Sequence, residues 1–144
     1  MFWRPFSEED ENRIKRAIEE AESVCSGEVR VHIDQFCKGD PMFKASNLFF
    51  HLNIDETANR NGVLIYVAIE DRKFCIIGDS GIDNKVPDNF WDATKEAMTE
   101  LFKKNRPVDA ILAGIKRAGN ELQHFFPSSS TDTNELSNDI SYGE

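Results

Sequence analysis

The stretch that decides the fold is NRNGVLIYVAIEDRKFCIIGDSGID, residues 59–83. It contains two apolar runs, residues 63–69 and 74–77, on either side of a short charged break. Apolar runs rich in β-branched and aromatic residues favour strands covered on both faces, and so short a break requires antiparallel pairing. The stretch therefore predicts a buried β-hairpin, with glycines and acidic residues just outside its strands.

A helix, a strand and a second helix are expected before this hairpin. Ser7 and the acidic residues after it are typical of a helix start, and Gly27 is suited to end that helix. Residues 29–34 then alternate between apolar and polar, which predicts a half-buried strand, and Pro41 opens the next helical pattern. Strand, crossover helix and strand make a βαβ unit, so the first two strands should be parallel.

Two further helical patterns follow the hairpin, one opened by Pro87 and Asp88 and the other by Pro107. We therefore expect an α/β fold with a small mixed sheet, in which strands one and two are parallel and strand three is antiparallel, and with four helices. A chain of 144 residues suits a single domain. We assign that domain to residues 1–127 and predict a disordered acidic tail at 128–144, because this segment is polar and contains no Lys or Arg.

The net charge of −9 argues against a nucleic-acid partner, since phosphate binding requires clustered Lys and Arg. Cys25, Cys37 and Cys75 lack metal-finger or CxxC spacing, which favours structural thiols in a reducing compartment. No apolar stretch approaches the ~20 residues of a transmembrane segment, and no signal peptide is apparent. We expect a soluble, cytoplasmic protein.

Polar residues should meet at one edge of the sheet. The N-terminal ends of the two parallel strands and the C-terminal end of the antiparallel third strand lie at the same edge, so Glu28, Asn61 with Arg60, and the segment from Asp79 to Asp83 should converge. Carboxylate, amide and carbonyl oxygens suit hard cations such as Ca²⁺ or Mg²⁺. The alternative is a polar turn in which the two aspartates bind backbone N–H groups or cap a helix.

The opposite edge, with Asp34, Glu70, Asp71 and Arg72, is a second candidate, because ligands of open parallel sheets usually bind beyond the carboxyl ends of the strands. The tight hairpin there leaves little room for a crevice. Covalent catalysis finds little support, since GxSxG, GxxxxGK[ST], GxGxxG and HExxH are all missing from the sequence.

Four segments carry a resemblance to a known family: GEVRV at 27–31, RNGVLIYVA at 60–68, DRK at 71–73 and GDSGI at 78–82. Together they resemble the TPM domain, over roughly residues 8 to 126, in its stand-alone bacterial form. The resemblance implies a Rossmann-like three-layer α/β/α sandwich, binding of divalent cations, typically calcium, and an acid-phosphatase activity. Members usually have Asn-Asn-Gly where this chain has Arg60-Asn61-Gly62, and often Gly-Tyr-Gly at Asp79-Ser80-Gly81.

Two functions are consistent with these expectations. The first is a calcium-binding module whose loops are ordered by the metal and present a surface to a protein partner. The second is a weak metal-dependent phosphatase acting on a phosphorylated substrate, with Asp79 as candidate catalytic residue. The expected metal ligands are Asp79, Asp83, Glu28, Asn61 and Asp88.

Overall fold

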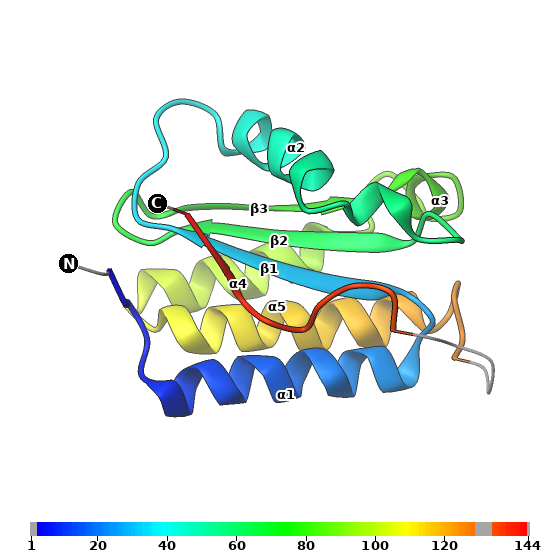
Figure 1. Ribbon diagram of the computed structural model, residues 1–144, viewed down its shortest axis with the longest axis horizontal. Coiled ribbons are helices and arrows are strands. Elements are labelled where there is room, and N and C mark those ends of the chain that lie inside the picture. Colours follow the sequence, from blue (N-terminus) through cyan, green and yellow to red (C-terminus); the bar gives the residue numbers. More distant parts are fainter. Residues whose placement is uncertain (1–2, 129–133, 144) are drawn as a thin grey trace.

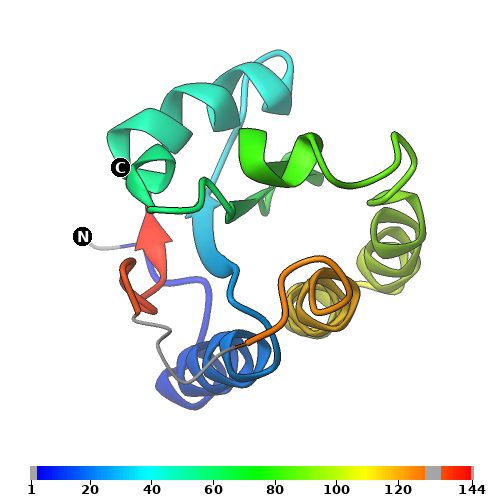
Figure 2. The same ribbon diagram turned by 90° about the vertical axis from the view of Figure 1, so that its right-hand side faces the viewer.

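The computed structural model describes residues 3–128 and 134–143. Along the chain the elements are α1 (Glu8–Val24), β1 (Glu28–Asp34), α2 (Pro41–His51), the 3-10 helix η1 (Ile54–Glu56), β2 (Gly62–Ala68), β3 (Lys73–Gly78), α3 (Ser80–Asp83), α4 (Asp92–Lys103), α5 (Pro107–Leu122) and β4 (Ser141–Tyr142). The sheet separates α2 and α3 on one face from α1, α4 and α5 on the other (Figures 1 and 2). This arrangement confirms the expected three-layer α/β/α sandwich.

The strand order is β3-β2-β1-β4, which places β2 and β1 in the middle of the sheet. β1 and β2 are parallel, and β2 and β3 form the antiparallel hairpin, as expected. Every residue of β2 is buried, whereas β3 is buried only in its middle. The expectation of cover on both faces therefore holds for β2, but β3 is an edge strand and is partly exposed.

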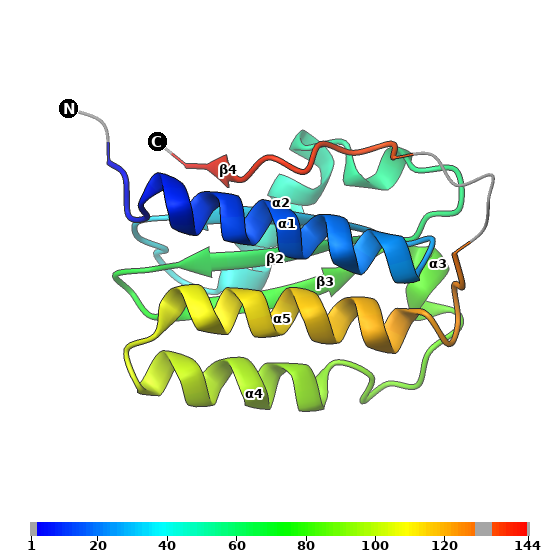
Figure 3. The ribbon, with the colours of Figure 1, turned by 90° about the horizontal axis from the view of Figure 1, so that it is seen from below.

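The core lies on both sides of the sheet. Val63, Ile65 and Val67 of β2 pack toward the three-helix layer, and the alternate residues Leu64 and Tyr66 pack toward α2. This alternation follows from the two-residue period of a strand. In the three-helix layer α5 lies between α1 and α4 and contacts both (Figure 3).

Two helical expectations need correction. α4 begins at Asp92, not at Pro87, because residues 88–91 form turns in which the amide of Phe90 donates to the carbonyl of Pro87 at 3.0 Å. The loop predicted after the third strand contains the short helix α3. The described chain therefore has five α-helices where four were expected.

The expectation of a disordered tail is wrong for residues 134–143. β4 pairs in parallel with β1, which aligns Ser141 with His32 and Tyr142 with Ile33. In Figure 3, α1 lies between β4 and α5. The amide of Gly143 donates to the carbonyl of Ile33 at 2.9 Å. A strand of two residues has no periodicity to recognise, so its pairing depends on contacts with distant residues. Residues 129–133 and 144 lie outside the described part.

Gly143→Ala should release β4 without unfolding the domain. A Cβ atom at residue 143 would overlap Oδ1 of Asp34 and lie 3.4 Å from Nε2 of His32. Relieving such overpacking costs about 1–3 kcal/mol, so amides of residues 134–143 should exchange with solvent roughly ten-fold faster or more. Hydrogen exchange followed by mass spectrometry measures this, with the exposed substitution Asn134→Ala as control. Unchanged exchange in Gly143→Ala would contradict the assigned packing.

Candidate functional site

The N-terminal ends of β1 and β2 and the C-terminal end of β3 meet at one edge, which we call the loop edge; it comprises loop residues 53–61 and 79–88 with Glu28. The amide of Asp79 donates to the carbonyl of Gly62 at 2.9 Å. The amide of Glu28 donates to the carbonyl of Asn61 at 3.3 Å. This edge faces the viewer in Figure 2. The convergence expected from connectivity is confirmed.

The two loops of this edge are in direct backbone contact. The amide of Gly81 donates to the carbonyl of Arg60 at 2.9 Å. A Cβ atom at residue 81 would overlap the carbonyl oxygen of Asn59 and lie 2.5 Å from that of Arg60. Only glycine therefore lets α3 come this close to the other loop.

Asp79 is the most constrained side chain of the loop edge. Its residue is 5% exposed and caps α3, with Oδ1 accepting from the amide of Ser80 at 2.7 Å. The guanidinium of Arg60 donates two hydrogen bonds to the same carboxylate, from Nε to Oδ2 at 2.7 Å and from Nη2 to Oδ1 at 2.8 Å. Such bidentate, charge-assisted pairs are strong and geometrically specific. The capping role considered in the sequence analysis is thus present, together with an ion pair that was not anticipated.

Asp83 and Asp88 lie on the same loop but are exposed. Asp83 is the last residue of α3, and partial desolvation of its carboxyl group, followed by the negative charge of Asp79, raises the pKa of that group. The charge of Asp79 therefore disfavours ionisation of Asp83. Asp88 lies in the turn that precedes α4.

Glu28 and Asn61 are buried and face other partners. Oε1 of Glu28 accepts from the amides of Glu135 and Leu136 at 2.5 and 2.8 Å. The side-chain amide of Asn61 donates to the carbonyl of Ser26 at 3.1 Å. Both side chains hold chain segments together, and among the described residues their hydrogen-bond partners do not include the Asp79 carboxylate. The five expected ligands thus divide into two groups at one edge.

The side chains of the described residues limit how a cation could be held. Within residues 3–128 and 134–143 no group of three or more His, Cys, Asp and Glu side chains could hold a metal ion. The oxygen groups of the loop edge include the Asp83 carboxylate, on which the charge of Asp79 acts, and the main-chain carbonyls of residues 59 and 60, which lie beside Gly81. Oxygen donors of this kind suit Ca²⁺ or Mg²⁺ better than Zn²⁺. The Arg60 guanidinium already occupies a cation position on Asp79. The donor chemistry fits a hard cation, and the ligand set remains a prediction.

The opposite edge holds a polar cluster that the alternation of β1 did not reveal. His32 and Asp34 were expected on a half-exposed face, but they are 3% and 6% exposed. Nε2 of His32 bonds Oδ1 of Asp34 at 2.8 Å, Nδ1 bonds Oγ of Ser141 at 2.9 Å, and the hydroxyl of Tyr66 donates to Oδ2 of Asp34 at 2.7 Å. Burial lowers the pKa of His32.

The direction of each hydrogen bond in that cluster follows from the donors and acceptors present. An ionised Asp34 can only accept hydrogen bonds, so the proton of neutral His32 is on Nε2 and Nδ1 accepts from the Ser141 hydroxyl. Because Ser141 lies on β4 and His32 on β1, the chain of bonds holds the C-terminal segment on the sheet. We assign it this structural role.

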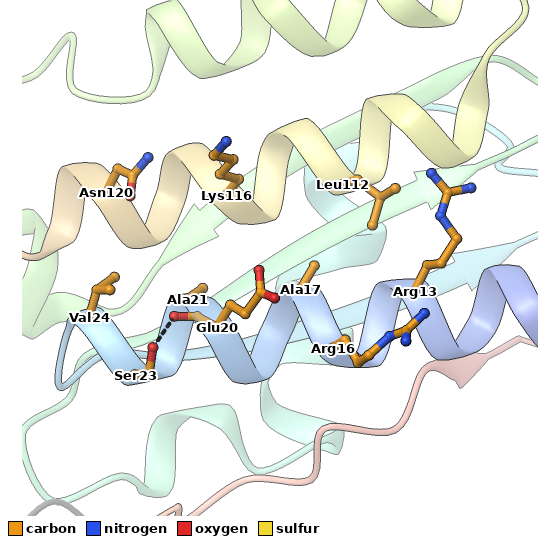
Figure 4. Close-up of a pocket in the computed structure, with 10 residues that line it drawn as sticks. All are labelled: Arg13, Arg16, Ala17, Glu20, Ala21, Ser23, Val24, Leu112, Lys116 and Asn120. Carbon is orange, nitrogen blue, oxygen red and sulfur yellow. Dashed lines mark hydrogen bonds between the residues drawn. The ribbon is translucent and has the colours of Figure 1, made fainter.

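A shallow groove of about 480 Å³ lies between α1 and α5, on the helical face of the sheet (Figure 4). It is lined by Arg13, Arg16, Ala17, Glu20, Ala21, Ser23, Val24, Leu112, Lys116 and Asn120. Small residues in this contact allow the helices to approach closely, since a Cβ at Gly119 would lie 2.8 Å from Cα of Ala21. Arg13 at the groove is paired with Asp10 and Asp109, so its charge is already compensated within the chain.

The side chain of Glu22 should make the free energy of unfolding depend on pH. Its Oε2 accepts from the amide of Val29 at 3.0 Å, near the C-terminal end of α1, where the helix dipole disfavours an anion. Burial, and less strongly the charge of Glu28, raises its pKa from 4.5 to about 7. Between these two values the folded state binds more protons than the unfolded state, so this contribution to stability falls as the pH rises through about 7.

Glu22→Gln should therefore be more stable than wild type at pH 8 and should have a flatter pH profile between pH 5 and 8. Gln can still accept from Val29 and carries no charge. Solvent screening at this partly exposed side chain limits the gain to about 1 kcal/mol. Urea denaturation at several pH values measures it, with the exposed Glu20→Gln as control. Parallel pH profiles for Glu22→Gln and wild type would refute the assignment.

No helix in the described ranges is long and apolar enough to cross a membrane. A search of curated proteins found no significant match. Among solved structures, BA42 from the psychrophilic bacterium Bizionia argentinensis is 40% identical, with 99% of each chain covered and a TM-score of 0.93. The N-terminal domain of cg2496 from Corynebacterium glutamicum is 19% identical, with 92% of this chain and 84% of that chain covered and a TM-score of 0.67.

A third structure, the N-terminal domain of a protein from P. gingivalis, is 15% identical, covers 84% of this chain and 78% of its own, and has a TM-score of 0.70. The last two likenesses concern the fold alone. The sequence model of the TPM domain matches residues 4–121, which include all of the loop edge. The chain therefore belongs to the TPM domain family.

Proposed function

We propose that the protein is a divalent-cation-binding module, with Ca²⁺ the favoured ion, and that the cation is held at the loop edge by Asp79 and Asp83 with main-chain oxygens. The observation that carries the proposal is the burial of the Asp79 carboxylate and its pairing with a positive charge. This nearly buried carboxylate already binds a cationic group through both oxygens. A buried carboxylate requires such compensation, because an isolated buried charge is costly.

A cation at this position would order the two loops. Asp79 and Asp83 repel each other, which contributes to the raised pKa of Asp83, and a divalent ion would reverse that repulsion. The loops already touch through Gly81 and Arg60, so a charge between them would act on both. The chain's part is to hold and orient the oxygens; the ion supplies the charge.

The surface beside this site suits a protein partner. A cavity of about 190 Å³ is lined by Arg60 and Asp79 together with Phe49, Phe50 and Ile77. Phe50 is 63% exposed, and Phe43, seven residues earlier on α2, is 73% exposed. Exposed aromatic side chains of this kind are typical anchors of protein interfaces. Ordering of the loops would therefore fix one wall of an aromatic surface.

Calcium should raise the melting temperature of the purified protein. Binding to the folded state alone adds about 2.7 kcal/mol at 100 times Kd, which corresponds to several degrees for a domain of this size. Asp83→Asn, an exposed change that should leave the fold intact, should reduce the shift to less than half, and Asp79→Asn should abolish it. The control is Asp71→Asn at the opposite edge, whose carboxylate also accepts from a backbone amide, that of Cys37 at 2.7 Å. No shift in wild type at millimolar Ca²⁺ or Mg²⁺ would refute the proposal.

Phosphomonoester hydrolysis is the second candidate, as the resemblance to the family implied. A phosphate would need the cation, because the Arg60 guanidinium at this edge is already engaged by Asp79. Turnover of p-nitrophenyl phosphate by the same preparation decides this alternative. Activity that requires Ca²⁺ or Mg²⁺ and disappears in Asp83→Asn would assign the phosphatase to the loop edge.

A further inference from the structure

We infer that Arg60 is the resident counter-ion of Asp79 and sets the cation affinity of the loop edge by competing with the divalent ion for the same carboxylate. This inference rests on the proposed function. It concerns a specificity-determining residue, since the Asp79 oxygens that would meet a metal ion are those that Arg60 binds at 2.7 and 2.8 Å. Cation binding is then an exchange of one positive group for another.

The backbone directs Arg60 to this position. Its φ angle is 50°, in the left-handed region that non-glycine residues other than Asn and Asp seldom adopt. The residue is fixed on both sides, because its amide donates to the carbonyl of Thr57 at 3.2 Å and its carbonyl accepts from Gly81 at 2.9 Å. The guanidinium is thus presented to Asp79 by the same crossing of loops that a cation would bridge.

Exchange is feasible because the two partners differ in exposure. The Asp79 side chain is 5% exposed and cannot move without breaking its cap on α3, whereas the Arg60 side chain is 48% exposed. Arg60 is long and flexible, and Asp55 also attracts its charge. The guanidinium can therefore leave to solvent, while the carboxylate stays in place.

Displacement of Arg60 would also change the surface beside it. Arg60 forms part of the cavity that Phe50 borders, so its departure would open that wall next to the exposed aromatic side chains of α2. The charge state of the loop edge would thereby be coupled to the shape of the neighbouring surface. A chain with a neutral residue at position 60 would lack this coupling.

The test compares Ca²⁺ binding by wild type and Arg60→Gln, with calorimetric titration for Kd and melting in chelator for stability. Arg60→Gln removes the competing charge, so it should bind Ca²⁺ at least ten-fold more tightly. In chelator it should melt at a lower temperature than wild type, and calcium should restore the difference. Arg60→Lys keeps the charge without the bidentate grip and should fall between the two.

Arg72→Gln is the matched control, because Arg72 also has a left-handed backbone, with φ 54°, but lies at the opposite end of the hairpin. It should bind Ca²⁺ as wild type does. Equal or weaker binding by Arg60→Gln, with wild type binding normally, would overturn the inference alone. Binding by neither protein at millimolar Ca²⁺ would overturn the proposed function and this inference with it. If Arg60→Gln folds only when calcium is added, that outcome supports the competition.

Discussion

The parallel pairing of β1 with β2 is the constraint on which the rest of the structure depends. β2 is buried along its whole length, so its register with β1 and β3 is set by side chains that pack on both faces. A slip of one residue would move Val63, Ile65 and Val67 from one core to the other. The same register brings Glu28, Asn61 and Asp79 to a single edge, although these residues are far apart in the sequence.

At that edge the charges are balanced within the chain. Asp79 is only 5% exposed and lies two residues before Gly81, where the two loops cross. Arg60 supplies the compensation that a carboxylate in such a place requires. The pair therefore serves stability in the absence of a ligand, and the same pairing is what any external cation would have to replace.

The sequence predicted the edge but not the contacts within it. Connectivity alone places Glu28, Asn61 and Asp79 together, because strand direction is determined by the crossover helix and the tight hairpin. The partner of each side chain depends on distances of a few ångströms, which periodicity does not contain. Nothing in the spacing shows that Glu28 faces residues 135 and 136 or that Arg60 adopts φ 50°. β4 was missed for the same reason, since only its contacts with β1 identify it.

The C-terminal segment connects the two ends of the sheet. Ser141 joins the polar cluster of His32 and Asp34 at the carboxyl end of β1, while the amides of Glu135 and Leu136 bind Glu28 at its amino end. The carboxylate of Glu135 in turn accepts from the amide of Ala58 at 3.1 Å, in the loop that carries Arg60. Docking of this segment and the order of the loop edge therefore share contacts, so that a change in either one acts on the other through Glu135.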